Sequence, residues 1–405
     1  MLILRMFVPS KLLEVRVAQI SGVPPLVRAT ARTVVPLAGF AAHVGRGFQR
    51  MATDAVLGDT RAFPRAAEDL DAAWLSKITG RTVTSVEVLD GSAGTSSRCR
   101  LALTGDGVPE TVFVKMSAQT AATRMLGELA NLGENEARFY DELSCELSAV
   151  PKAYGTSWDS LTGRFVIVLE DLPQDSVQFF DTLHPLDSDQ AGRLVETLAD
   201  IHGTFWNRLP AGRGKGALGW LTATSDERSL PITRPLMRMS ARRLADRTSI
   251  PIEDGRFVIE NYPAAVRLID NGHHTVLHGD SHPGNIFVRN GKAGLLDWQV
   301  VKRGHPTRDI AYSLITGMTT DDRRANQRDL LDVYRAALAA GGGPELDRDD
   351  LWDRYRQAAV QPFLASLTTA GLGGMQSEEI AFEGLRRAVD AFDDLDTVAL
   401  LQKSL

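Results

Sequence analysis

The chain has 405 residues, of which 43% are hydrophobic and 24% charged, and its formal net charge is −6. This length allows a large buried core and exceeds the usual size of one domain. The acidic balance, without basic stripes or RNA-binding signatures, argues against nucleic acid as a partner. Two cysteines are too few for a disulfide framework and no run of eighteen apolar residues occurs, so we expect a cytoplasmic protein.

The first fifty residues differ in charge from the rest of the chain. They contain seven basic residues and a single acid, Glu14, with apolar residues between them. Three interpretations stay open: an amphipathic segment on a membrane surface, a transit peptide, or a disordered tail added by an upstream start codon. We assign residues 1–60 to a basic N-terminal extension that is either disordered or on a membrane surface, and in the second case residues 1–50 would make the peripheral membrane contact. A chain that starts at about Asp59 is expected to fold.

A glycine- and serine-rich segment follows the first predicted strand. Residues 83–89 alternate apolar and polar side chains, as a half-buried strand does, and residues 91–97 then break the pattern. Small residues let backbone N–H groups approach an anion, although an ordinary hairpin turn is an equal alternative because the segment lacks the lysine of a P-loop. The candidate phosphate contacts are Gly91, Gly94, Thr95 and Ser96.

A lysine lies inside the next pair of predicted strands. Residues 99–103 and 111–116 are expected to form these strands, and Lys115 stands in the apolar part of the second. A lysine in a buried strand is costly unless it is paired, which favours a functional role over an edge position. A helix is predicted next, with Phe139 and Leu143 among its packing positions.

The most informative segment lies at residues 278–297. It reads His-Gly-Asp-Ser-His-Pro-Gly-Asn from His278 to Asn285, and Asp297 closes the next short apolar run. One carboxylate can orient an acceptor proton while an amide oxygen and a second carboxylate hold Mg²⁺ against ATP phosphates. A zinc site built on His278, Asp280 and His282 is the alternative, but no fourth ligand lies nearby in the sequence.

This segment resembles the catalytic loop of kinases, H-R-D-x-x-x-x-N followed by D-F-G, with Gly279 in place of the arginine. In detail the chain resembles the aminoglycoside phosphotransferase and choline kinase superfamily, and within it the ecdysteroid-kinase-like (CHK kinase-like) branch. The resemblance implies an α+β, bilobal protein-kinase-like fold. It places a small antiparallel sheet with one helix in an N-lobe at residues 61–172, and a larger, mainly helical C-lobe at residues 173–405.

The resemblance also implies ATP and Mg²⁺ as cofactors and assigns roles to particular residues. Lys115 would contact the phosphates and pair with Glu136, which stands three residues before Phe-Tyr as in the family, with Glu134 as the alternative. Asp280 would orient the acceptor, while Asn285 and Asp297 would hold the metal. Glu170 and Leu172 would lie at the adenine-binding hinge, although a solvent-facing strand end is an alternative. The auxiliary residues are His278, His282 and Asp309.

The acceptor is expected to be a small molecule. A helix begins at Arg308, eleven residues after Asp297, which leaves no room for the peptide-binding segment of protein kinases. The acids of the C-terminal helices alternate with arginines, so we expect a neutral, partly apolar alcohol. An aminoglycoside 3'-type phosphotransferase and a nucleotide-binding pseudokinase without turnover stay as alternatives. Possible pocket acids, with a solvated face as the alternative, are Asp390, Asp393, Asp394 and Asp396, and possible apolar walls are Trp352, Tyr355, Phe363, Phe382 and Phe392.

Overall fold

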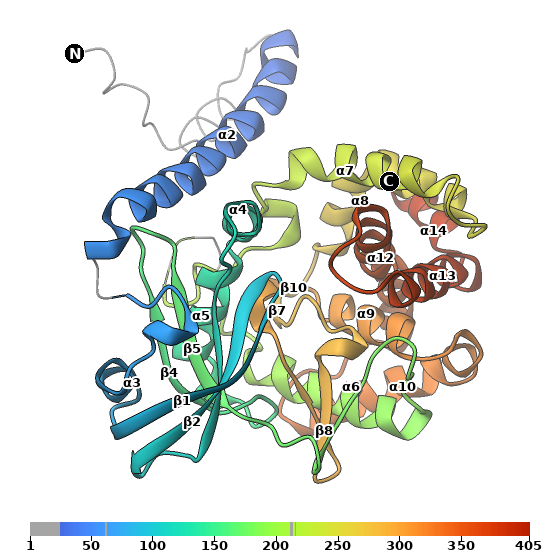
Figure 1. Cartoon of the computed structure of the whole chain (residues 1–405). Coiled ribbons are helices and arrows are strands. Elements are labelled where there is room, and N and C mark those ends of the chain that lie inside the picture. The colour runs from blue at the N-terminus through green and yellow to red at the C-terminus, as the bar shows by residue number, and fades with distance from the viewer. Residues whose placement is uncertain (1–24, 61–62, 211–213, 215) are drawn as a thin grey trace.

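The computed structural model describes residues 25–60, 63–210, 214 and 216–405, and Figure 1 shows their arrangement. A β-sheet with several helices forms one lobe, and a larger, mainly helical lobe packs beside it. The α+β class and the bilobal, kinase-like arrangement expected from the sequence are confirmed. Residues 1–24, the first part of the expected extension, lie outside the described residues.

The N-lobe sheet has the strand order β1-β2-β3-β5-β4, and every neighbouring pair is antiparallel. Its strands are β1 (Thr82–Ala93), β2 (Ser96–Asp106), β3 (Thr111–Ser117), β4 (Ala153–Trp158) and β5 (Phe165–Glu170). Successive side chains point to opposite faces of a strand. Cys99 and Leu101 therefore point outward and pack with Leu75 of α3 (Ala72–Thr79). Phe113 and Lys115 alternate with outward-facing valines and point inward.

Two consecutive helices accompany the sheet, α4 (Ala121–Ala130) and α5 (Leu132–Glu142). The sequence predicted α5, and its buried Phe139 packs in one cluster with Ile167 on the inner face of β5. It did not predict α4 or the break between the two helices. Asn131 makes this break because its backbone adopts the left-handed conformation, with φ at 54°, which asparagine tolerates better than most residues.

The C-lobe consists of helices around two small sheets that carry the predicted catalytic loop. Its helices are α6 (Ser188–Thr204), α7 (Leu230–Leu244), α8 (Arg256–Ile269), α9 (Thr307–Gly317), α10 (Thr320–Ala340), α11 (Arg348–Ala358), α12 (Val360–Leu372), α13 (Glu378–Asp394) and α14 (Thr397–Ser404). The strands are β6 (Val177–Phe179), β8 (Ile286–Arg289) and β9 (Lys292–Leu295) in one sheet, and β7 (Thr275–Leu277) with β10 (Lys302–Gly304) in the other. The catalytic loop thus runs between two strands, β7 and β8.

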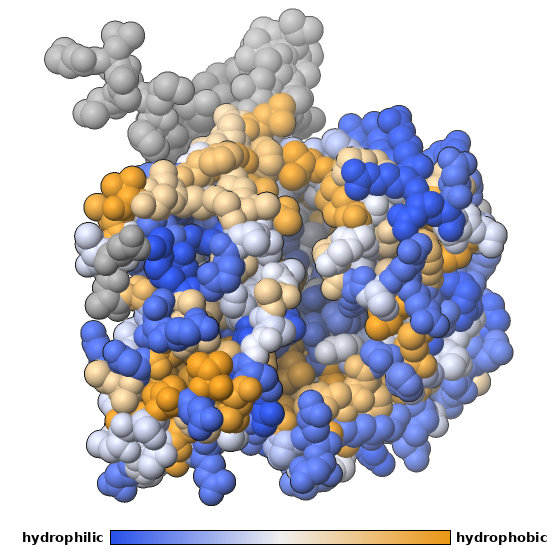
Figure 2. Space-filling view, in the orientation of Figure 1, coloured by the Kyte–Doolittle hydropathy of each residue, from blue (hydrophilic) through white to orange (hydrophobic). Residues whose placement is uncertain are grey.

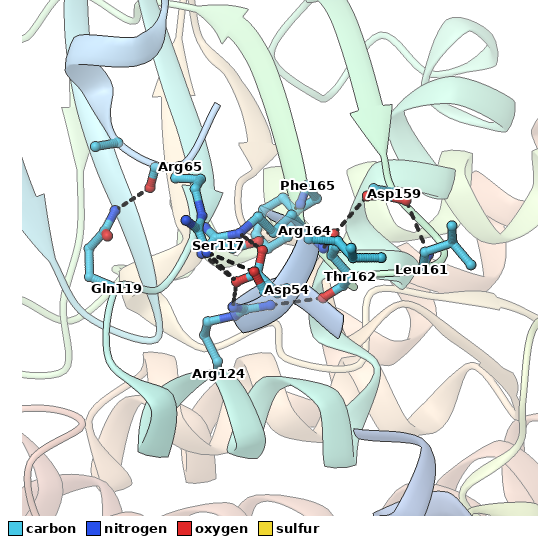
Figure 3. Close-up of polar contacts among 12 residues, drawn as sticks. Asp54, Arg65, Ser117, Gln119, Arg124, Asp159, Leu161, Thr162, Arg164 and Phe165 are labelled. Carbon is cyan, nitrogen blue, oxygen red and sulfur yellow. Dashed lines mark hydrogen bonds and ion pairs between the residues drawn. The ribbon is translucent and has the colours of Figure 1, made fainter. Parts of the chain in front are cut away.

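A long helix, α2 (Pro25–Leu57), lies along the N-lobe, and its N-terminal end extends beyond the rest of the molecule (Figure 1). Near its C-terminal end Asp54 is buried among arginines from later segments (Figure 3). Arg164 Nε lies 2.7 Å from Asp54 Oδ1, and Arg124 pairs with the second oxygen. Burial favours protonation, but Arg164 and Arg124 hold the pKa of Asp54 well below its usual range.

These contacts move the expected domain boundary near residue 60. Arg50, one turn before Asp54, pairs with Glu128 of α4 at 2.8 Å, and His43 Nε2 lies 3.0 Å from the carbonyl oxygen of Leu129. Residues 43–57 are therefore part of the N-lobe and not of a separate extension. Little in the local sequence indicates this, because Arg124 and Arg164 stand 70 and 110 residues after Asp54, and only Arg65, which pairs with Asp54 at 3.2 Å, is close along the chain.

No helix in the described part of the chain is both long enough and apolar enough to cross a membrane.

A chain that starts at Asp59 lacks Asp54 and leaves Arg124 and Arg164 buried without their carboxylate. Removing one partner of a buried ion pair typically costs about 3–5 kcal/mol. We therefore expect a chain starting at Asp59 to unfold at a clearly lower denaturant concentration than a chain starting at Pro25. Equilibrium denaturation of both, with the full-length chain as reference, measures the difference.

Asp54→Asn is the matched variant, because it keeps the helix and removes only the charge. It should reproduce much of the loss at neutral pH. Since the pKa of Asp54 is depressed on folding, its contribution is complete above the unfolded pKa of about 4 and is lost as the pH falls below it. Equal stability of the two shortened chains would contradict this and return the boundary to residue 60.

Candidate active site

Asp309 holds the backbone of the catalytic loop in place. It lies in the first turn of α9, and its carboxylate accepts the backbone N–H of His278 at 2.6 Å and of Gly279 at 2.9 Å. Burial opposes its ionisation, but His202 and these donors keep the pKa of Asp309 below its ordinary value. The charged carboxylate therefore fixes the backbone that leads directly into Asp280.

The backbone conformation at Gly279 and its close packing exclude an arginine from this position of the motif. Its φ is +83°, which side chains rarely adopt, and a Cβ added there would lie 2.4 Å from the carbonyl oxygen of Val300. The loop is thus packed against the segment that follows Asp297.

His278 is fully buried and uses both ring nitrogens within the chain. Its Nε2 lies 2.8 Å from the carbonyl oxygen of Leu296, and its Nδ1 accepts the backbone N–H of Asp280 at 3.2 Å. Burial lowers the pKa of His278, so the ring is neutral and carries its proton on Nε2. No ring nitrogen is left to bind a metal, which removes the zinc alternative.

Asp280 is oriented by neighbours from two elements. Asn285 donates from Nδ2 to the Asp280 carbonyl at 2.8 Å, and Tyr312 on α9 is a neighbour of the carboxylate. Burial and this carboxylate raise the pKa of Tyr312, so Tyr312 remains a neutral donor. His282 Nε2 stands 3.9 Å from Asp280 Oδ2. The carboxylate is 25% exposed, which leaves it accessible to an acceptor.

Lys115 links the two lobes. Its Nζ lies 2.6 Å from Glu136 Oε2 on α5 and 2.7 Å from Asp297 Oδ1, at the end of β9. Lys115 is 3% exposed and Glu136 only 1%. Glu134, the alternative partner, instead stands 3.5 Å from Arg50. The structure thus brings together Lys115, Glu136 and Asp297, which are distant in the sequence.

One ammonium group serves two carboxylates in this arrangement. Burial raises the pKa of Glu136 to about 7, against the attraction of Lys115. Burial acts in the same direction on Asp297, but Lys115 and Arg98 hold the pKa of Asp297 below its ordinary value. Burial disfavours charge on Lys115 as well, yet Asp297 and Glu136 raise its pKa. Lys115 is therefore charged, Asp297 is its ionised partner, and Glu136 is the group closest to protonation at neutral pH.

An aromatic contact joins the segment that follows β9 to α5. Asp297 has a φ of 60°, and the next residue, Trp298, is fully buried. Trp298 stacks on Phe139 of α5 with 3.9 Å between ring centroids. Glu136 and Asp297, which flank Lys115, are thus supported by adjoining side chains from both lobes.

A cavity of about 250 Å³ opens beside Lys115 at the junction of the lobes. Residues that line it include Arg98, Arg100, Phe113, Lys115, Glu136, Glu170, Asp171, Leu172, Asn285 and Asp297. The acids at the hinge are engaged, since Glu170 pairs with Arg289 and Asp171 accepts from Arg100 Nη2 at 2.7 Å. The backbone at 170–172 is therefore better placed than these carboxylates to contact a nucleotide base.

The segment 91–97 forms a tight hairpin between β1 and β2, and its role as a phosphate loop stays a prediction. Gly91 belongs to β1 and pairs with Cys99, so only Gly94 and Thr95 lie between the strands. The strand ladder uses backbone N–H groups that a phosphate loop would present. In the structure as described, Thr95 and Ser96 line a separate hollow beside α4 and α5, and none of the four candidate contacts lines the cavity beside Lys115.

Sequence reasoning missed Arg98 and Arg100, which lie on the inner face of β2 and line the same cavity as Lys115. Arg98 stands directly opposite Lys115 on the neighbouring strand, and its Nη2 lies 3.4 Å from Asp297 Oδ2. The sequence does indicate their orientation, because Cys99 and Leu101 are apolar and alternate with the two arginines, which therefore point to the other face of the strand. Predicting that Arg98 lies beside Lys115 also requires the register between β2 and β3, which the sequence does not give.

A second, much smaller hollow of about 30 Å³ lies beside His282 and Tyr312, next to Asp280. Its other lining residues, within the described chain, are Thr182, Thr316, Ala365, Ser366, Thr369, Gln376, Ile380, Ala381 and Gly384. These side chains carry hydroxyl, amide and methyl groups, and none of them is a carboxylate.

The acids and aromatic residues expected to form the acceptor pocket lie elsewhere. Asp390 pairs with Arg386 at 2.9 Å and Asp394 with Arg324 at 2.9 Å, so both are neutralised within the helical lobe. Among the predicted walls, Tyr355, Phe363 and Phe392 are buried in the C-lobe core. Composition placed these residues in the right lobe, but their ion pairs and packing could not be read from it.

The sequence model of the phosphotransferase enzyme family matches residues 92–358, from the end of β1 to the end of α11. Among solved structures, the chain is similar to choline kinase from Streptococcus pneumoniae, with 17% identity, a TM-score of 0.44, and 77% of this chain and 94% of that chain covered. It is also similar to macrolide 2'-phosphotransferase from Brachybacterium faecium, with 17% identity, a TM-score of 0.45, and 78% and 98% covered. No curated protein sequence matches the chain.

Proposed function

Because this chain belongs to the phosphotransferase enzyme family, we propose that it transfers the γ-phosphoryl group of ATP, with Mg²⁺, to a hydroxyl group of a small neutral molecule. The observation that carries the proposal is the position of Lys115 between Glu136 and Asp297, beside a cavity that reaches the hinge. Asp280 stands next to a second hollow, so donor and acceptor would meet between the two.

Lys115 and Arg98 supply positive charge for the nucleotide phosphates. Both cations pair with Asp297, and bound phosphates would give them other anionic partners. Asp297 and the amide oxygen of Asn285, whose nitrogen already donates to Asp280, would then hold the metal. Bound Mg²⁺ offsets the charge that develops on the phosphate oxygens during transfer.

Asp280 orients the acceptor hydroxyl and takes its proton. The hydroxyl oxygen forms a bond to the γ-phosphorus while the bond from that phosphorus to the β–γ bridging oxygen breaks, and ADP leaves. Asn285 contacts both the carbonyl and the carboxylate of Asp280 and limits their rotation, which keeps the proton acceptor in position.

The composition of the second hollow supports a neutral acceptor. A polycation in a closed pocket needs a carboxylate for each ammonium group, because an unpaired charge carries a desolvation cost. Hydroxyl groups of Thr182, Thr316 and Ser366 instead offer hydrogen bonds to an alcohol, with Ile380 as an apolar wall. A neutral, partly apolar alcohol suits this lining better than an aminoglycoside does.

Two alternatives make different demands on the same residues. An aminoglycoside 3'-type phosphotransferase would need acids near Asp280, whereas Asp390 and Asp394 are occupied by arginines. The hypothesis of a pseudokinase, which binds nucleotide without turnover, would be favoured if one of the residues needed for phosphoryl transfer were missing from the sequence. The set expected for turnover is instead present and assembled: Lys115, Glu136, Asp280, Asn285 and Asp297.

We expect substitution of Asp280 and of Asp297 to impair the enzyme in different ways. Asp280→Asn should leave Mg·ATP affinity nearly unchanged and lower turnover by about 10²- to 10⁴-fold, the usual range for a positioned acid–base group. Asp297→Asn removes a charged metal ligand and should weaken Mg·ATP binding as well as turnover. Calorimetry of Mg·ATP binding together with a coupled ADP-release assay measures both effects. Loss of Mg·ATP binding in Asp280→Asn, with binding intact in Asp297→Asn, would reverse the two roles.

Steady-state kinetics on an acceptor panel tests the substrate class. The panel should contain neutral alcohols of graded polarity and aminoglycosides such as kanamycin. We expect the highest kcat/KM for a neutral alcohol, with little dependence on salt because no charge pairing with the acceptor is involved. A highest value for kanamycin that falls steeply at high salt would favour the aminoglycoside alternative. ADP release with no panel member, despite tight Mg·ATP binding, would favour the pseudokinase.

A further inference from the structure

Helix α2 exposes an apolar stripe on the side that faces away from the N-lobe. Apolar side chains recur there at intervals of three and four residues, which aligns them along one face of the helix. The members are Leu37, Ala41, Val44, Phe48, Ala52 and Ala55, which we call the outer stripe. Leu37 is 48% exposed and Phe48 60%. Side chains of this size are normally covered when they follow one another along a helix face.

The opposite face of α2 does the packing. His43, Arg50 and Asp54 are buried and bind the N-lobe through hydrogen bonds and ion pairs. The helix is therefore held in place without any contribution from the outer stripe. An apolar face that is not needed for folding is available for another contact.

Other exposed apolar residues lie on the same part of the molecule. Val56 at the end of α2 is 76% exposed, and Leu126 on the neighbouring helix α4 is 66% exposed. Figure 2 shows hydrophobic residues gathered over this end of the N-lobe. Residues 25–57 also precede the region matched by the family model.

This part of the chain is basic. Residues 15–53 contain no acid, and the first one, Asp54, is neutralised by arginines of the N-lobe. Arg28, Arg32 and Arg46 stand within the bounds of α2, and Arg46 is exposed, whereas Arg50 is buried and paired with Glu128. The 24 residues before the helix add Arg5, Lys11 and Arg16 against Glu14. Because the whole chain is acidic, this end carries a local positive charge on an otherwise negative protein.

We propose that the outer stripe docks on the surface of an anionic lipid bilayer. An apolar helix face on a basic segment is the combination that lies at the headgroup level, where the apolar side chains are buried and nearby cations are attracted to lipid phosphates. A second copy of this chain would be a poorer occupant, because it would bring two positively charged helices together.

Vesicle cosedimentation of the full-length chain tests this proposal. The vesicles should be phosphatidylcholine alone and phosphatidylcholine mixed with phosphatidylglycerol. We expect binding to the anionic vesicles, weaker binding to the neutral ones, and a decrease at high salt. Leu37→Gln/Phe48→Gln should lower the partition coefficient by roughly 10- to 100-fold, because two large apolar side chains no longer insert.

A matched control is Leu372→Gln/Leu405→Gln, which changes two exposed leucines of the C-lobe and should bind vesicles as the unaltered chain does. Thermal unfolding of both double variants should match that of the unaltered chain, because all four positions are exposed. No binding of the unaltered chain to anionic vesicles overturns the proposal, as does equal binding by the stripe variant. Sedimentation velocity that shows a dimer dissolved by the stripe substitutions, without vesicle binding, would assign this face to self-association.

Discussion

The buried ammonium group of Lys115 is the charge on which the meeting of the two lobes depends. A buried lysine is strongly destabilising without close carboxylates. Glu136 comes from an N-lobe helix and Asp297 from a C-lobe loop, so the pairing of Lys115 requires both lobes in place. The stack of Trp298 on Phe139 crosses the same junction. Arg98 is a second cation beside Asp297, so the charges of this cluster are balanced within the protein.

Two support networks converge on this group from opposite sides. On the C-lobe side, Asp309 fixes the backbone of the catalytic loop and His278 joins it to the segment that ends in Asp297. On the N-lobe side, α2 holds α4 through Arg50 and Asp54, and α4 leads through Asn131 directly into the helix that carries Glu136. The helix whose outer face we assign to a membrane is therefore also part of the support of the donor site.

The sequence predicted well what is encoded within short segments. Residues 278–297 show the catalytic loop because its aspartates and asparagine lie close together along the chain and share a small, local framework. Arg98 was not predicted because its position opposite Lys115 depends on the register between two strands. The role of Asp54 was not predicted because its partner Arg164 is distant in the sequence. The glycine and serine content of residues 91–97 did not show how far the two paired strands continue toward the turn. The sequence also could not show which acids are neutralised by arginines, because packing decides which side chains form ion pairs.

Calorimetric titration of Mg·ATP into the full-length chain and into Lys115→Met tests most directly whether this ammonium group is held for a nucleotide. We expect binding by the unaltered chain and a loss of affinity of about 10-fold or more in the variant, since hydrogen bonds to charged groups contribute about 1.5–3 kcal/mol. Circular dichroism would establish that the variant is folded. A folded Lys115→Met variant that binds Mg·ATP as tightly as the unaltered chain would contradict the role given to Lys115.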